Sequence, residues 1–183
     1  SISPNALSDS VKSVFFNAQD YHVTVVYPLP FNKWLSWVNP DNGEVQGRRK
    51  SPRHFTEYDA FYELYKIKSY LKNPNLSINL VLMDMEEYKL LNGWSYDKKR
   101  GSTRYDRVPV GIRRIVKFDR IEDYMQLVPA DLKEDFTVKD FAMAAGVSVE
   151  ASRYTLNILN YLEIVKRTGR VKNGYVYNVT EEF

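Results

Sequence analysis

The stretch that decides the fold is residues 136–180, FTVKDFAMAAGVSVEASRYTLNILNYLEIVKRTGRVKNGYVYNVT. Thr137 and Asp140 have the spacing of a capping box, in which each side chain satisfies a backbone N–H at a helix start. A short helix is therefore expected to begin there, with an apolar face, and to end at Gly146.

A second helix and a β-hairpin are expected after this turn. Ser148 can cap a helix over residues 148–162, where apolar side chains recur at three- and four-residue spacing. Residues 164–179 then contain two β-rich runs, and Asn173-Gly174 between them is the strongest two-residue hairpin signal. The predicted order is helix, turn, helix and hairpin.

This arrangement suits DNA, because an α-helix fits the major groove, where base edges present distinguishable donors and acceptors. Arg153 can donate two hydrogen bonds to guanine, and Asn157 can pair with adenine, while Ser152 and Tyr154 can reach phosphate oxygens. The hairpin adds four cations that suit the DNA backbone or minor groove, namely Lys166, Arg167, Arg170 and Lys172. The alternative is an ordinary solvated hairpin.

The pattern is carried by residues 136–142, 146–148, Leu156, Leu159 and 164–167. It resembles the winged helix-turn-helix domains of bacterial transcriptional regulators. The resemblance implies a three-helix domain with recognition helix 148–162 and a basic wing at 164–179 that binds double-stranded DNA. Glu163 departs from the pattern, since many such domains have Gly where the recognition helix ends. Winged domains also bind proteins, so a protein-protein adaptor is an alternative.

Charge is distributed unevenly along the 183 residues, which favours two domains. Residues 1–118 contain 18 Lys and Arg against 12 Asp and Glu, whereas residues 119–183 contain 8 against 11. The expected fold class is α+β, with a mixed α/β domain over 1–118 and a winged helix-turn-helix over 119–183. The elements expected in the first domain are a helix at 5–18, a strand at 22–27, a hairpin at 33–46, a helix at 56–71, and strands at 76–83 and 111–118.

A second phosphate-binding surface is a further hypothesis for the first domain. Positions 98–117 hold eight basic residues against Asp106 alone. Tyr105 lies among them and Tyr96 shortly before them, and interleaved aromatic and basic residues are typical of surfaces that bind nucleic acid. The candidate residues are Arg48, Arg49, Lys50, Arg53, Lys98, Lys99, Arg100 and Arg104. A solvated basic face explains the pattern equally well.

The enzymatic alternative is a magnesium-dependent nuclease, and whether the chain is an enzyme stays open. Glu63, Asp84, Asp97 and Lys99 resemble the acidic residues and lysine of the PD-(D/E)xK nuclease class. In that class carboxylates hold a divalent ion, so magnesium is expected only under this alternative. The first two thirds of the chain also resemble uncharacterised bacterial proteins that join such a region to a winged helix, which implies no activity.

Several classes of site and location are disfavoured by composition. The chain has no cysteine and two histidines, His22 and His54, so no thiolate or histidine metal site is expected. No apolar run has the length of a membrane span, and no secretory signal is visible. The expected location is cytoplasmic, without a membrane partner. A protein partner or a homo-oligomer stays open.

Overall fold

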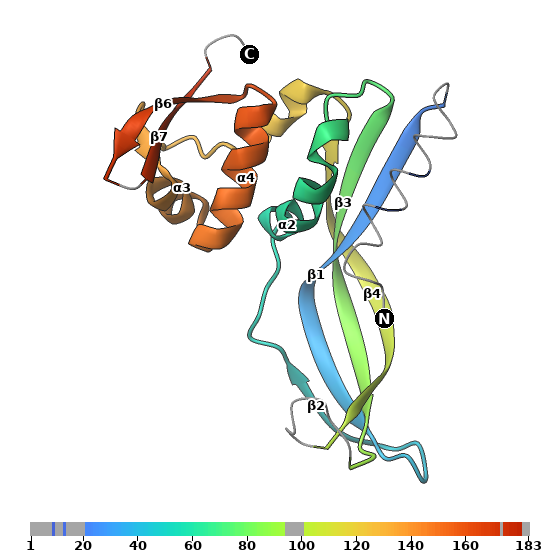
Figure 1. Ribbon diagram of the computed structural model, residues 1–183. Coiled ribbons are helices and arrows are strands. Elements are labelled where there is room, and N and C mark those ends of the chain that lie inside the picture. Colours follow the sequence, from blue (N-terminus) through green and yellow to red (C-terminus); the bar gives the residue numbers. More distant parts are fainter. Residues whose placement is uncertain (1–8, 10–12, 14–20, 94–100, 173, 181–183) are drawn as a thin grey trace. The chain divides into compact units, whose positions relative to one another are not determined.

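The computed structural model describes residues 9, 13, 21–93, 101–172 and 174–180 (Figure 1). The helix predicted at 5–18 therefore lies outside the described residues, apart from the helical Asp9 and Ser13. Contacts group the chain into two compact units, each described by itself. Unit 1 comprises residues 1–27, 57–79 and 117–183, and unit 2 comprises residues 28–56 and 80–116.

The larger sheet is mixed and has the strand order β2-β1-β3-β4. Its strands are β1 (Val23–Val38), β2 (Val45–Lys50), β3 (Leu76–Leu90) and β4 (Thr103–Phe118). β1 and β2 are antiparallel, as the predicted hairpin requires. β1 and β3 run parallel, because the N–H of Val23 bonds to Asn75 at one end and that of Leu91 to Val38 at the other. The predicted α+β class is confirmed at this level.

The strands are longer than the sequence predicts. β1 does not end at Pro28 but continues through Pro30 to Val38. Strand β2 pairs only with Trp34–Val38, so Pro28 and Pro30 lie in a part of β1 that has no β2 partner, and their missing N–H groups break no β1–β2 hydrogen bond. β3 likewise continues through the acidic residues 84–87, and β4 begins at Thr103 rather than at 111.

The helix predicted at 56–71 consists of three short pieces. They are the 3₁₀ helix η1 (Glu57–Ala60), the single α-helical turn α2 (Phe61–Leu64) and the 3₁₀ helix η2 (Tyr65–Tyr70). Ile67 interrupts the helical backbone, with φ of −111° and ψ of 16°. The apolar stripe is nevertheless correct, since Phe61, Leu64 and Ile67 are completely buried.

The C-terminal part of unit 1 contains the elements that the opening stretch predicts (Figure 1). After the 3₁₀ helix η3 (Ile121–Leu127) come β5 (Phe136–Thr137), α3 (Val138–Ala145), α4 (Val149–Tyr161), β6 (Val165–Val171) and β7 (Gly174–Val179). The three strands form an antiparallel sheet of order β5-β7-β6. Sequence reasoning missed β5, whose second residue, Thr137, also begins the capping box.

Both predicted helix starts are confirmed. The backbone N–H of Asp140 donates to the Thr137 hydroxyl, and that of Thr137 donates to the Asp140 carboxylate at 2.8 Å. The Ser148 hydroxyl accepts from Ala151 at the start of α4. Gly146 ends α3 with φ of 65°, a left-handed conformation that glycine adopts without steric cost.

The hairpin is also confirmed, but its turn differs from the prediction. Val171 pairs with Gly174, so Gly174 belongs to β7 rather than to the turn. Lys172 adopts a positive φ of 54°, while Asn173 lies outside the described residues. Glu163, the departure from the expected glycine, has φ of 69° and thus takes the left-handed conformation that glycine favours.

Unit 1 has an aromatic core, in which Phe136 lies between Phe141 and Tyr177 at centroid distances of 6.3 and 6.1 Å. Residues 57–79 belong to this unit because η1, α2 and η2 all contact α4. The two units defined by contacts thus differ from the two domains predicted from sequence, 1–118 and 119–183. That domain boundary stays a prediction. In the described residues, no helix is long and apolar enough to cross a membrane.

Candidate functional site

The hairpin of unit 1 is the most basic surface of that unit's C-terminal stretch. Its four cations, called here the hairpin cations, are all exposed, and residues 164–180 contain no acidic residue. The hairpin cations are Lys166, Arg167, Arg170 and Lys172. The structure therefore places the four predicted cations at exposed positions, and their role in binding phosphates stays a prediction.

Two hairpin cations share one aromatic ring. The guanidinium carbons of Arg167 and Arg170 lie 4.1 and 4.5 Å from the ring centroid of Tyr175. A register shift between Arg167 and Gly169 makes this possible, because residues three apart would otherwise lie on opposite faces. Arg170 also donates to the Tyr175 hydroxyl at 2.6 Å, and this hydrogen bond is the main cause that lowers the pKa of Tyr175.

The residues predicted to read DNA from α4 have different surroundings. Ser152 is fully buried, and its hydroxyl donates to the Ser148 carbonyl at 2.9 Å. Its hydroxyl therefore cannot reach a phosphate in this structure, which corrects its predicted role. Arg153 is exposed, as groove or phosphate contact requires.

Tyr154 and Asn157 face the helical segment 57–72 of the same unit. The Tyr154 ring packs edge-on against Tyr62 and Tyr65 at centroid distances of 5.1 and 5.5 Å. The Asn157 carbonyl oxygen accepts a hydrogen bond from the Lys68 ammonium at 3.0 Å. Both side chains thus make contacts within unit 1. In this conformation they are not available to bind DNA.

Lysines strengthen the same contact between α4 and residues 57–72. The Lys68 and Lys72 ammonium groups lie 5.2 and 5.1 Å from the Tyr161 ring centroid. Lys72 also pairs with Glu163 at 2.5 Å, and this contact lowers the pKa of the Glu163 carboxyl. Sequence reasoning missed this surface. Tyr62 and Tyr65, three residues apart beside the apolar stripe of this segment, could have indicated a second contact face.

The predicted upstream basic residues stack on aromatic rings in unit 2. Arg48 and Lys50 lie 5.4 and 5.6 Å from the Trp34 ring centroid, on the face that the β1–β2 register predicts. Arg49 lies over Trp37 at 5.4 Å, and Arg53 over Phe55 at 4.3 Å. Trp37 is buried and Trp34 is half-buried, which fits the opposite faces that residues three apart take in a strand.

Carboxylates of β3 hold some of these cations. Glu86 accepts from Arg48 Nε at 2.8 Å and from the Ser36 hydroxyl at 2.9 Å, and the Arg48 hydrogen bond is the main cause that lowers the pKa of Glu86. Arg104 lies 3.9 Å from Glu87. The remaining candidates of the second surface, Lys98, Lys99 and Arg100, lie outside the described residues.

The carboxylates predicted for a nuclease site have cationic partners. Glu63 pairs with Lys66 at 2.9 Å, and Asp84 accepts from Asn32 and Arg113, each at 2.7 Å. Asp97 and Lys99 lie outside the described residues. In the part of the chain that the structure describes, no group of three or more Asp, Glu or His side chains could hold a metal ion.

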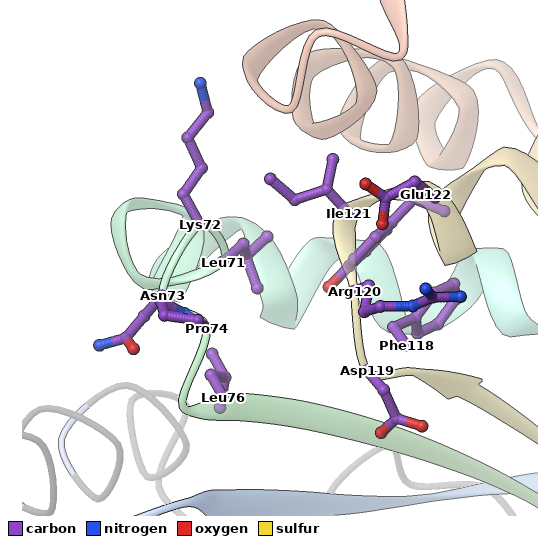
Figure 2. A pocket seen from close by; sticks show the side chains of 11 residues that line it. Leu71, Lys72, Asn73, Pro74, Leu76, Phe118, Asp119, Arg120, Ile121 and Glu122 are labelled. Atoms are coloured by element: carbon purple, nitrogen blue, oxygen red, sulfur yellow. The ribbon is translucent and has the colours of Figure 1, made fainter. Parts of the chain in front are cut away.

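A pocket of about 290 Å³ lies in unit 1, between the end of η2 and the start of η3. Figure 2 shows Leu71 and Ile121 pointing into the space between these segments, whereas Lys72 and Asn73 point away. The pocket also has the oppositely charged Asp119 and Arg120 in its lining, so it selects no single charge class of ligand.

A family described as "Domain of unknown function (DUF8091)" matches residues 5–119. The chain belongs to this family. The DUF8091 region ends beside the predicted boundary at 118 and contains Asp84 and the upstream basic residues, but not the hairpin.

The chain is also similar to an "Uncharacterized protein" of Treponema pallidum (strain Nichols), with 27% identity over 146 residues. The match covers 76% of this chain and 55% of the relative, so the chain spans about half the length of that protein. No solved structure matches the chain significantly.

Proposed function

We propose that the protein binds double-stranded DNA through the β6–β7 hairpin of unit 1. The observation that carries the proposal is the exposed set of four hairpin cations in a segment without acidic residues. Each cation that neutralises a phosphate releases a counterion, which favours binding at moderate salt. Two of them are oriented by Tyr175, which reduces the conformational freedom lost on binding.

The winged helix-turn-helix resemblance supports duplex DNA as the ligand. Helices α3 and α4 follow each other across the turn at Gly146, and the hairpin comes directly after α4, in the order of that domain class. In this proposal β6–β7 is the wing, and the protein acts as a bacterial regulator-like DNA-binding protein in the cytoplasm. The absence of cysteine is compatible with a reducing compartment.

The wing, rather than the face of α4, makes the first contact in this proposal. Arg153 is the exposed member of the four predicted reading residues of α4, while Tyr154 and Asn157 contact residues 57–72. Glu150, one helical turn before Arg153, is also exposed and repels phosphates. Phosphate contacts from the hairpin therefore dominate affinity, and we expect only weak sequence preference.

A pair of matched double variants tests the proposal. Lys166→Ala/Lys172→Ala removes two hairpin cations, and Lys117→Ala/Lys133→Ala removes two exposed lysines elsewhere in unit 1. Duplex affinity is measured by fluorescence anisotropy across a salt series. The slope of log K against log salt is negative, and each phosphate contact contributes about 0.9 to its magnitude. We therefore expect the hairpin variant to have a shallower slope, smaller in magnitude by roughly two.

The control variant is expected to keep the wild-type slope. Equal slopes in the wild type and the hairpin variant, or duplex affinity that does not depend on salt, would contradict the proposal. A protein-protein adaptor would show no duplex affinity that weakens with salt or with loss of the hairpin cations. The nuclease alternative is tested by magnesium-dependent cleavage that is lost in Asp84→Ala and Asp97→Ala.

A further inference from the structure

Unit 2 contains a second group of cations, arranged around a single carboxylate. Glu87 of β3 is buried, and four cationic side chains from β1, β3 and β4 lie within 4.0 Å of its oxygens. Arg107 Nε is closest at 2.8 Å. Lys33 follows at 3.5 Å, and Lys89 and Arg104 each lie at 3.9 Å. These five residues are called here the Glu87 cluster.

The charges of the Glu87 cluster do not balance. Four cations face one carboxylate, which leaves three positive charges, and two remain when the neighbouring Asp106 is counted. Asp106 uses a carboxylate oxygen to accept the backbone N–H of Arg107 at 2.7 Å. A structural ion pair needs one cation for each carboxylate, so the surplus calls for a separate explanation.

Burial raises the pKa of Glu87, but the hydrogen bond from Arg107 and the charges of Lys33, Arg107 and Arg104 outweigh it, so its net pKa lies below the usual range. The carboxylate is therefore ionised at neutral pH. It lies beneath the cations, with 4% of its side-chain surface exposed, whereas Arg104 is 56% and Arg107 43% exposed. The solvent-facing side of the Glu87 cluster is cationic.

An arginine offers five N–H donors in a planar fork, and one carboxylate oxygen satisfies only part of that set. Glu87 holds Arg107 through Nε, so the carboxylate orients the guanidinium at the protein surface. Guanidinium groups in fixed positions bind phosphate oxygens through charge-assisted hydrogen bonds. The arrangement resembles a preformed anion site more than a stabilising ion pair on an exposed surface, which contributes little.

We propose that the Glu87 cluster is a binding site for phosphate groups. Arg104 and Arg107 donate to the phosphate oxygens, Lys33 and Lys89 add positive charge, and Glu87 positions the cations. The site lies in unit 2 and is independent of the hairpin in unit 1. The phosphate can belong to a nucleic-acid strand or to a small phosphate compound, and these two sources are distinguished by experiment.

The test uses the full chain with Lys166→Ala/Lys172→Ala as background, so that the hairpin does not dominate binding. Two probes are titrated, a fluorescent single-stranded oligonucleotide followed by anisotropy and inorganic pyrophosphate followed by calorimetry. Arg104→Gln/Arg107→Gln is compared with Lys133→Gln/Lys139→Gln, which removes two positive charges at exposed positions that belong to none of the candidate phosphate-binding surfaces. We expect the first pair to weaken binding roughly tenfold and the second by far less, because charge-assisted hydrogen bonds are the strong ones.

Loss of oligonucleotide binding alone identifies a nucleic-acid strand as the ligand, and loss of pyrophosphate binding identifies a small phosphate compound. Binding of neither probe, or equal weakening by both pairs of substitutions, overturns the proposal. Arg104→Gln alone serves as the variant that keeps the fold, since Arg104 is exposed and 3.9 Å from Glu87. It should show a measurable part of the loss with an unchanged melting temperature. The duplex experiment on the hairpin can fail without affecting these outcomes.

Discussion

At the scale of single residues, the best-defined electrostatic contact is that of Asp84. The hydrogen bond from Arg113 is the main cause that lowers the pKa of Asp84, while burial acts in the opposite direction. The folded-state pKa therefore lies below the unfolded value, which is about 3.9 for aspartate. The ionised carboxylate stabilises the folded state above that pH, and this contribution is lost as the pH falls through the folded pKa.

Arg113→Gln should reduce this acid sensitivity. We expect the variant to lose stability at neutral pH and to show a smaller difference in unfolding free energy between pH 7 and the acidic range below about pH 4. Urea unfolding at a series of pH values measures this difference in unfolding free energy. Lys117→Gln, which removes an exposed cation from the same strand, serves as control and should keep the wild-type pH dependence. The same pH dependence in all three proteins would show that Arg113 does not set the pKa of Asp84.

At the scale of elements, the turn between α3 and α4 depends on one glycine. Gly146 has φ of 65°, and a Cβ atom added there would meet nothing within 4 Å. Substitution by alanine is therefore unfavourable for conformational reasons alone, since the left-handed region costs an L-residue about 1–2 kcal/mol. Gly169 in β6 has equally open surroundings and no positive φ.

We expect Gly146→Ala to lower the unfolding free energy by about 1 kcal/mol, because the turn must keep its left-handed backbone. Gly169→Ala is the matched control and should change stability by less than about 0.5 kcal/mol. Urea unfolding of both variants supplies the comparison. A Gly146→Ala protein as stable as the control would mean that α3 can end in another conformation.

Local chemistry made the C-terminal elements predictable from sequence. Thr137, Asp140, Gly146 and Ser148 act within a few residues of their own positions, so their effect on the backbone does not depend on distant partners. Strand lengths in the larger sheet were not predictable in this way. Whether Pro28 ends β1 depends on which strands pair with β1 at that point. Strand pairing is a property of the whole sheet and cannot be read from residues 28–30 alone.

The candidate site was predictable only in part, for the same reason. The hairpin cations follow directly from the sequence, because a two-stranded hairpin exposes most of its side chains. The surroundings of Tyr154 and Asn157 could not be foreseen, since their partners Tyr62 and Lys68 are about 90 residues earlier in the chain. The helical period shows which residues share a face, but not what covers that face.

At the scale of the whole molecule, residues 57–79 are grouped with the C-terminal residues and not with the sheet residues that flank them in sequence. Phe61 and Leu64 are completely buried, and the Tyr58 hydroxyl donates to the Leu127 carbonyl at 2.9 Å. The C-terminal part thus completes its core with a segment that belongs to the DUF8091 match.

A fragment of residues 119–183 should therefore be less stable than the same residues in the full chain. Without residues 57–79, the fragment exposes the face of α4 whose Tyr154 and Tyr161 rings contact that segment in the full chain. We expect the fragment to unfold at a clearly lower urea concentration, with circular dichroism as the measurement. A fragment with the unfolding midpoint of the full chain would instead show that residues 119–183 are an independent domain.

The register shift in β6 determines which face of the hairpin carries Arg167, and the amino-acid composition of the hairpin does not. Thr168 is the extra residue that brings Arg167 and Arg170 onto the ring of Tyr175. Deleting Thr168 would preserve every charge of the hairpin and restore simple alternation, so Arg167 would move to the opposite face. The side of the hairpin on which Arg167 lies is therefore determined by the number of residues in β6 and not by the number of its cations.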